Sequence, residues 1–102
     1  MTISTFKVQV VDLAPNLSTR PVGAMARDRL VQLLNDYSVI EVDFEHHSLT
    51  PSFADECIGR LAAVIGFEQF KQRIKLVNIN ASNRPLVKHV IVTRCQEGVL
   101  MH

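Results

Sequence analysis

Three short runs of the chain have the composition and alternation of β-strands. They cover residues 6–13, 39–44 and 74–79. The first alternates apolar and polar side chains before turning continuously apolar, which is typical of a strand with one face partly open to solvent. The second is largely apolar and reads as a buried strand. We therefore predict three strands, each followed by a segment of different periodicity.

Helical spacing predicts three main helices between and after these strands. The first starts near Thr19 and runs to Tyr37, with Pro21 in its first turn, where the missing N–H would be unpaired in any case. Val22, Met25, Ala26, Leu30, Leu33 and Leu34 form its apolar stripe. The second covers residues 52–65, and Gly66 suits a left-handed cap at its end.

A short helix or turn over residues 67–73 is expected next, with Phe67 and Phe70 as inward anchors. The last helix follows a cap segment at residues 80–83 and has Pro85 in its first turn. Residues 90–93 are β-branched and could form a strand instead. A four-residue repeat through Leu86, Val90 and Arg94 favours the helix.

The order strand–helix, repeated three times, predicts an α/β fold with a mostly parallel sheet of about three or four strands and right-handed crossovers. The length of 102 residues allows one compact domain, with a core over residues 5–95. Residues 96–102 are predicted to be a frayed tail.

Parallel strands deliver all their following loops to one edge of the sheet. The three loops carry hydroxyls, amides, a cation and carboxylates, and three helix N-termini point to the same rim. Arg20, Asn80 and Ser82 are the candidates there for holding an anion or small ligand. The alternative is that each polar side chain in these loops simply caps a helix.

Composition narrows the function classes. Hydrophobic residues make up 47% of the chain and the formal net charge is +1, which argues against disorder and nucleic-acid binding. No apolar run approaches the roughly 20 residues of a membrane span, and the first residues lack the features of a secretory signal. We expect a cytoplasmic protein, in which Cys57 and Cys95 are buried thiols.

Ser52, at the start of the second helix, has two interpretations. Ser52 and Asp55 fit a capping box, in which Asp55 reaches back to the cap. Alternatively, Thr50 caps the helix with Pro51 in its first turn, which leaves the Ser52 hydroxyl available for chemistry. Phe53 is out of step with the apolar stripe of this helix, so it is either tucked under the loop or exposed as an anchor for a partner.

At these residues the chain resembles the small bacterial STAS-like family of unassigned function. The matching pattern is an Asp-Phe strand end, residues 43–44, followed by a Ser-Phe-Ala-Asp-Glu helix start, residues 52–56, and its continuation through residue 61. Residues 18–23 and 70–78 also fit. The resemblance covers roughly residues 5–95 and implies a single STAS-like domain over 1–102.

STAS domains include the anti-anti-sigma factors, which are phosphorylated by a kinase-type anti-sigma factor on a serine at the start of the second helix. The resemblance places Ser52 at that position as a phosphoacceptor candidate. The chain departs from the pattern of the anti-anti-sigma factors next to this serine, because Thr50-Pro51 precedes it and Phe53 follows it. A phosphate there would carry about −2 charge, favoured by the helix dipole and opposed by Asp55 and Glu56.

Members of the STAS-like family are often encoded with, or fused to, histidine-kinase-like (GHKL) ATPases. The resemblance therefore implies a non-catalytic regulatory domain that docks such an ATPase, with no cofactor and no metal. The partner-binding residues predicted on this basis are Thr50, Pro51, Ser52, Phe53, Asp55, Glu56 and Arg60.

Two alternatives remain open. The first is a small enzyme or a ligand- or nucleotide-binding module that uses the rim, with candidates Arg20, His46, His47, Asp55 and Glu56. The two histidines are adjacent, so their rings diverge on an extended loop and make a poor metal signal. The second alternative is a structural or dimerising domain without a switch.

Overall fold

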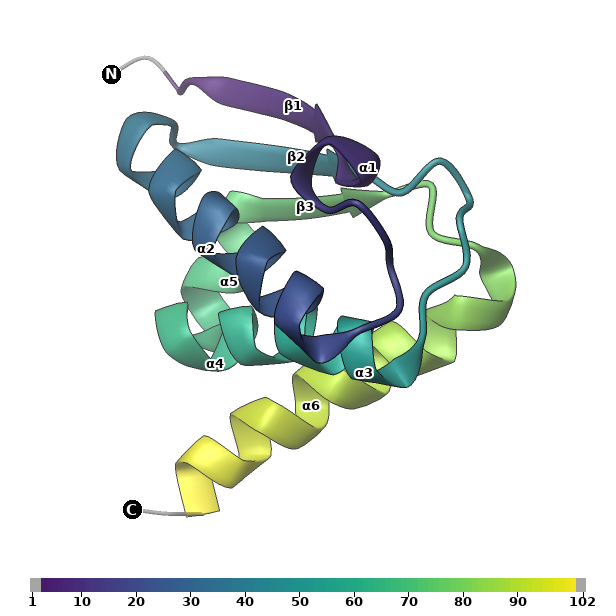
Figure 1. Cartoon of the computed structure of the whole chain (residues 1–102). Helices are drawn as coiled ribbons and strands as arrows, with labels where there is room; N and C mark the ends of the chain where they lie inside the picture. Colours follow the sequence, from purple (N-terminus) through teal and green to yellow (C-terminus); the bar gives the residue numbers. More distant parts are fainter. Residues whose placement is uncertain (1–2, 101–102) are drawn as a thin grey trace.

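The computed structural model describes residues 3–100 and contains a three-stranded parallel sheet (Figure 1). The strands are β1 (Thr5–Gln9), β2 (Val39–Asp43) and β3 (Ile74–Val77), and they lie in the order β1-β2-β3. Thr5 is opposite Val39 and Ile40 is opposite Ile74. The predicted α/β class with strands alternating with helices is confirmed.

The helical segments fill the connections and follow the last strand. They are α1 (Val10–Leu13), α2 (Arg20–Asp36), α3 (Pro51–Ala54), the π-helical η1 (Asp55–Gly59), α4 (Arg60–Ile65), α5 (Phe67–Arg73), the 3₁₀-helical η2 (Ala81–Asn83) and α6 (Arg84–Leu100). Because α3, η1 and α4 follow one another without a break, residues 51–65 form one helical stretch with a π-helical middle. The prediction of a helix in the β-branched run near residue 90 is confirmed.

The main helices lie on one face of the sheet (Figure 1). Right-handed crossovers between strands taken in sequential order place every connecting helix on the same side. Along β2, Ile40 and Val42 are buried against the helices, while Glu41 alternates with them and faces the other way. The second face of the sheet is therefore left without a helical layer, and in register it carries Lys7, Glu41 and Lys75.

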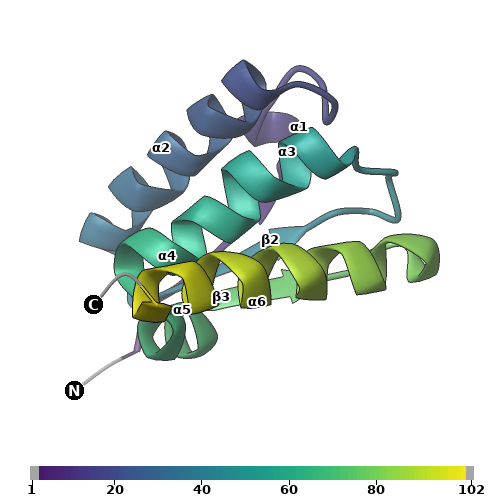
Figure 2. The same ribbon diagram turned by 90° about the horizontal axis from the view of Figure 1, so that it is seen from below.

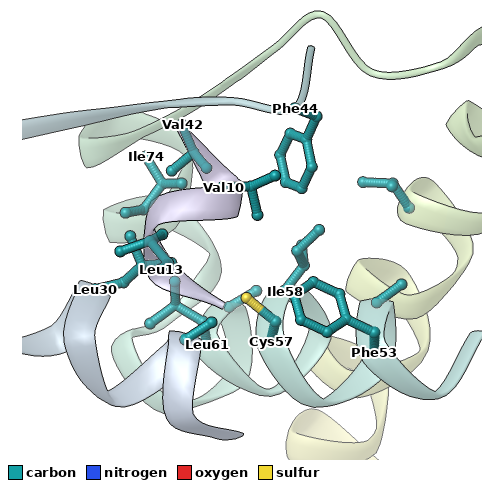
Figure 3. Packing of buried hydrophobic residues seen from close by; sticks show 14 of the residues in the cluster. Val10, Leu13, Leu30, Val42, Phe44, Phe53, Cys57, Ile58, Leu61 and Ile74 are labelled. Carbon is teal, nitrogen blue, oxygen red and sulfur yellow. The ribbon is translucent and has the colours of Figure 1, made fainter. Parts of the chain in front are cut away.

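The core lies between the sheet and the helices (Figure 3). Its largest fully buried side chains are Phe44, Phe53, Ile40, Ile58, Leu61, Val10, Val42 and Cys57. Removing one such side chain from water contributes about 1.5–3 kcal/mol to folding. The helical stretch 51–65 supplies four of these residues, so it is held in the core along most of its length.

The first strand ends earlier than predicted. Residues 6–13 were expected to form one strand, but β1 stops at Gln9, which is the last residue paired with β2. Val10 and Leu13 lie one helical turn apart in α1 and are both buried. A continuous apolar run does not distinguish a strand from a helical turn, because the apolar side chains at its two ends can be buried in either structure.

Other boundaries and burials also differ from the predictions. The third strand stops at Val77, because Asn78 has a positive φ of 56° that turns the chain. Phe67 and Met25 were expected to face the core, but both are exposed. The helix α6 extends through Leu100, and the remainder of the segment expected to be a tail, residues 101–102, lies outside the described residues.

Gly66 separates α4 from α5. Its φ is 89° and its ψ is 145°, so the φ is positive as a left-handed cap requires, but the ψ lies outside the left-handed helical region. A residue with a Cβ atom would be strained there. Gly66 thus lies between α4 and α5 in a backbone conformation that differs in ψ from the predicted left-handed cap.

Hydrogen bonds join the three loops at the carboxyl edge of the sheet. The Thr50 N–H donates to the Leu17 carbonyl at 3.2 Å, which ties the second loop to the first. The Leu49 N–H donates to the Asn83 side-chain oxygen at 3.1 Å, which ties the second loop to the third. The predicted convergence of these loops is confirmed.

Candidate functional site

Thr50 is the residue that caps the helical stretch 51–65. Its Oγ1 accepts a hydrogen bond from the Phe53 N–H at 3.2 Å and donates one to the Ser18 carbonyl at 2.7 Å. Pro51 occupies the first helical position. The capping box between Ser52 and Asp55 is therefore wrong, and the rival helix start at Thr50 is correct.

Ser52 lies in the first turn of α3 with a half-buried side chain. Its hydroxyl makes no hydrogen bond with any residue that the structure describes, because the capping position is filled by Thr50. Side chains three and four positions apart share a helix face, so Ser52 lies on the same face as Asp55 and Glu56.

Phe53 is fully buried. Its ring lies in the core, in the group of side chains that includes Ile58 and Phe44 (Figure 3). Of the two interpretations offered for Phe53, the tucked position is correct. The ring of Phe53 therefore offers no exposed surface in this structure, and its predicted role in binding a partner stays a prediction.

The Asp55 carboxylate is held by two arginines from distant segments. Arg94 of α6 donates to it twice, from Nε to Oδ1 at 2.8 Å and from Nη2 to Oδ2 at 2.5 Å. Arg20 of α2 donates from Nη1 to Oδ2 at 2.8 Å. The hydrogen bonds from Arg94, and next those from Arg20, outweigh partial burial and lower the pKa of Asp55 to about 2.

Glu56 is surrounded by three arginines. Arg27 Nη1 lies 2.9 Å from Oε2, and Arg60 Nε and Arg20 Nη1 lie 3.0 Å and 3.3 Å from Oε1. Arg27 also donates to the Glu56 carbonyl at 2.8 Å. Partial burial raises the pKa of Glu56, but the hydrogen bond from Arg27 and the charges of the arginines outweigh it, so the pKa lies below its ordinary value.

Together these six residues form what we call the arginine–carboxylate cluster: Arg20, Arg27, Asp55, Glu56, Arg60 and Arg94. Four guanidinium groups surround two carboxylates, so the cluster carries an excess of two positive charges. The side chains of Asp55 and Glu56 are only 16% and 12% exposed. Both acidic residues, predicted to contact a partner, are instead engaged within the chain.

Two glycines allow the helices to approach closely at the cluster. A Cβ on Gly23 of α2 would lie 2.8 Å from the Glu56 Cβ, and one on Gly59 would lie 3.0 Å from the Val90 carbonyl oxygen. The π-helical η1 contains Asp55 and Glu56 and packs between α2 and α6. Such local widening of a helix is frequent at functional sites.

Sequence reasoning did not identify Arg27 and Arg94 as members of the cluster. Arg20 and Arg27 lie seven residues apart, so they share a face of α2 with Gly23 between them. That spacing is a weak signal, because Arg is common on exposed helix faces. Arg94 comes from α6, and only the packing of α6 on η1 brings it to Asp55.

The rim candidates do not assemble into one site. Arg20 directs its guanidinium to Asp55 and Glu56. The Asn80 Oδ1 accepts from the Ser82 N–H at 3.0 Å and from its hydroxyl at 2.7 Å, so these two residues stabilise η2. Over residues 3–100, no hydrogen bond joins Arg20 to either of them.

His46 and His47 lie in an exposed loop, in which Glu45 and His46 have positive φ. The part of the chain that the structure describes contains no group of three histidine, cysteine, aspartate or glutamate side chains that could hold a metal ion. No helix in that part is long and apolar enough to cross a membrane. Cys57 is buried as predicted, whereas Cys95 is only half-buried.

The fold and the cluster together define a small α/β domain in which a one-sided parallel sheet presents a helix start tied to two neighbouring loops. The comparison with known protein families matches residues 25–84 to the family described as STAS-like domain of unknown function, and the chain belongs to that family. The predicted resemblance is confirmed. The match includes Ser52, Asp55 and Glu56, while Arg20 and Arg94 lie outside it.

Comparisons with curated proteins and with solved structures gave no significant match.

Proposed function

We propose that this STAS-like domain is a non-catalytic regulatory module that docks a histidine-kinase-like ATPase through the first turn of α3, with Ser52 as the phosphoacceptor. One observation carries the proposal. Thr50 caps the helix, so the Ser52 hydroxyl makes no hydrogen bond among the described residues and is available to a kinase.

The docking surface is smaller than the set of residues predicted from the sequence. Phe53 is buried, and Asp55 and Glu56 are paired with arginines. Other side chains of the helical stretch and of α2 are exposed or half-buried and remain available to a partner. They are Pro51, Ser52 and Arg60, together with Arg20 from α2.

The charges around Ser52 suggest how a phosphate would act. The two carboxylates that were expected to repel it are already paired, and the cluster has an excess of two positive charges. A phosphate carries about −1.5 to −2 charges at pH 7 and would neutralise that excess. A partner attracted by Arg20 and Arg60 would then be released.

The proposal is tested with a phosphorylation assay. A histidine-kinase-like ATPase is first recovered together with the chain from its native extract. The purified pair is incubated with ATP, and modified residues are mapped by mass spectrometry. We expect phosphoserine at Ser52 and none in Ser52→Ala, with Ser48→Ala, an exposed loop serine, as the matched control. Ser52→Asp should weaken the complex by about tenfold or more.

A complex that forms without any modification of Ser52 would leave a docking domain and remove the phosphoswitch. If neither a complex nor phosphoserine is observed, and Ser52→Asp behaves as the unmodified chain, the whole proposal is wrong.

A further inference from the structure

An apolar groove lies along α6, on a side of this helix that the cluster does not use. It is lined by side chains from α6, the start of α5 and the segment after β3, and it encloses about 350 Å³. The lining residues are Phe67, Ile79, Arg84, Val87, Lys88, Ile91 and Val92. Val90 and Arg94 of the same helix instead face Gly59 and Asp55, so the groove and the cluster are separate surfaces.

Two large apolar side chains of the groove are exposed to solvent. Phe67 is 46% exposed and Val92 is 40% exposed. The α6 residues of the lining recur at positions 84, 87, 88, 91 and 92, so they form one stripe about 12 Å long, or roughly two helical turns. Within this stripe Val87 is buried and Ile91 is half-buried, so Phe67 and Val92 supply the exposed apolar surface on which another helix can pack.

The charges of the groove indicate the sign of its partner. Arg84 and Lys88 are exposed, and neither makes an ion pair or hydrogen bond within the described residues. At the other end, Lys71 lies 5.5 Å from the centre of the Phe67 ring but is 3.8 Å from Glu68, so that end is close to neutral. None of the described lining residues is acidic, and the groove therefore carries a net positive charge.

This charge argues against a symmetric dimer. Two copies that met through the same groove about a two-fold axis would place the Arg84 and Lys88 side chains of both copies in one interface, with no acidic side chain among the described lining residues to offset them. A membrane is also a poor fit, since a concave groove receives side chains, whereas a bilayer is entered by protruding ones.

We propose that the groove along α6 binds an amphipathic helical segment of a partner protein, with apolar anchors facing Phe67, Ile91 and Val92 and with acidic residues facing Arg84 and Lys88. This interaction surface goes beyond the proposed function, which uses the first turn of α3. The two surfaces allow one chain to hold two partners at once.

The test is an NMR titration with a synthetic helix-forming peptide that has leucines on one face and glutamates on the other. A second peptide has lysines in place of the glutamates. We expect the acidic peptide to shift the methyl resonances of Ile79, Val87 and Ile91, and to bind at least about tenfold more tightly than the basic one. Added salt should weaken this binding.

Two substitutions locate the binding. Val92→Asp should abolish it, while Val31→Asp, at a valine of α2 that is 36% exposed, should leave it unchanged. Helices α2 and α6 lie on opposite sides of the stretch 51–65 (Figure 2), so the control is remote from the groove. If Val92→Asp fails to fold, Lys88→Glu at an exposed position, which leaves Arg84 and residue 88 with no net charge, should remove the preference between the two peptides.

The proposal is overturned if the methyl groups do not shift at about 1 mM acidic peptide, since that excludes even weak binding. Equal affinity for both peptides, or unchanged binding by Val92→Asp and Lys88→Glu, also overturns it. Sedimentation with anionic vesicles without peptide binding would assign the groove to a membrane surface. Self-association that Val92→Asp abolishes, seen by light scattering, would assign it to a second copy of the chain.

Discussion

At the scale of single residues, the decisive feature is how the charges near Ser52 are paired. Arg94 holds Asp55 with two hydrogen bonds, and Arg27 holds the side chain and carbonyl of Glu56. Two-point contacts between a guanidinium and a carboxylate are among the stronger polar interactions in proteins. The acidic pair is therefore a structural link between α2, η1 and α6, and Arg20 and Arg60 are the more exposed charges of the cluster.

This link predicts a pH-dependent stability. The pKa of Asp55 is lowered from 3.8 to about 2, so its ion pairs stabilise the fold above about pH 4 and are lost as pH falls towards 2. We expect Asp55→Asn to lower the free energy of unfolding at pH 7 by about 1–2 kcal/mol, after allowance for solvent screening. Urea denaturation at several pH values measures the difference.

The difference between the unmodified chain and Asp55→Asn should shrink as the pH falls through that range. Asp28→Asn is the control, because Asp28 is exposed on α2 and makes no ion pair within the described residues. A difference that stays constant between pH 7 and pH 2 would contradict the role given to the Asp55 charge.

At the scale of elements, the stretch 51–65 organises the molecule. Its N-terminus is tied to the first loop by Thr50, its middle packs against α2 and α6, and its inner face supplies core residues. Gly23 and Gly59 permit this close packing. The position of Ser52 is thus set by an element that is fixed on several sides, which favours a defined surface for a partner.

The cap predicts opposite effects for two neighbouring hydroxyl residues. Thr50→Ala removes the acceptor for the Phe53 N–H and the donor to Ser18, and should lower the free energy of unfolding by about 1 kcal/mol or more. Ser52→Ala should change it by no more than about 0.5 kcal/mol and towards greater stability, since alanine has the higher helix propensity. Chemical denaturation of both variants compares them directly.

If Ser52→Ala proves as destabilising as Thr50→Ala, Ser52 is part of the cap, and its hydroxyl is not free for modification. That result would also remove the observation on which the proposed function rests.

At the scale of the whole molecule, helices cover one face of the sheet, and the labelled core side chains lie between the sheet and the helices (Figures 1 and 3). Cys57 lies in this core, and burial raises the pKa of its thiol to about 12. Cys95 is half-buried, and burial raises its pKa as well. The two thiols should therefore differ in how far the fold must open before a reagent can reach them.

Thiol labelling should separate the two cysteines. In the native protein a small alkylating reagent should modify Cys95 slowly and Cys57 only through global unfolding, because the reactive thiolate of Cys57 is both inaccessible and rare. The rate at Cys57, followed by mass spectrometry, should rise with denaturant as the unfolding equilibrium does. Rapid labelling of Cys57 without denaturant would show that the core between the sheet and the stretch 51–65 opens locally.

The alternation of strands and helices, the convergence of the loops and the two alternative helix starts could be predicted from the amino-acid sequence. Each follows from local periodicity, capping chemistry or the geometry of parallel sheets. The sequence also carried the family resemblance through residues 52–56, within the matched range. Its errors included α1, Met25 and Phe67, where short apolar patterns fit more than one structure.

The choice of helix start, the position of Phe53 and the pairing of Asp55 and Glu56 could not be predicted and are seen only in the folded chain. These depend on contacts between residues far apart in the chain: Thr50 with Ser18, Arg20 with Asp55, and Arg94 with Asp55. Local sequence records which residues can cap a helix or pair with a charge. It does not show which residue the packing of α2 and α6 brings within hydrogen-bonding distance. The free Ser52 hydroxyl and the arginines near it are therefore seen only in the folded chain.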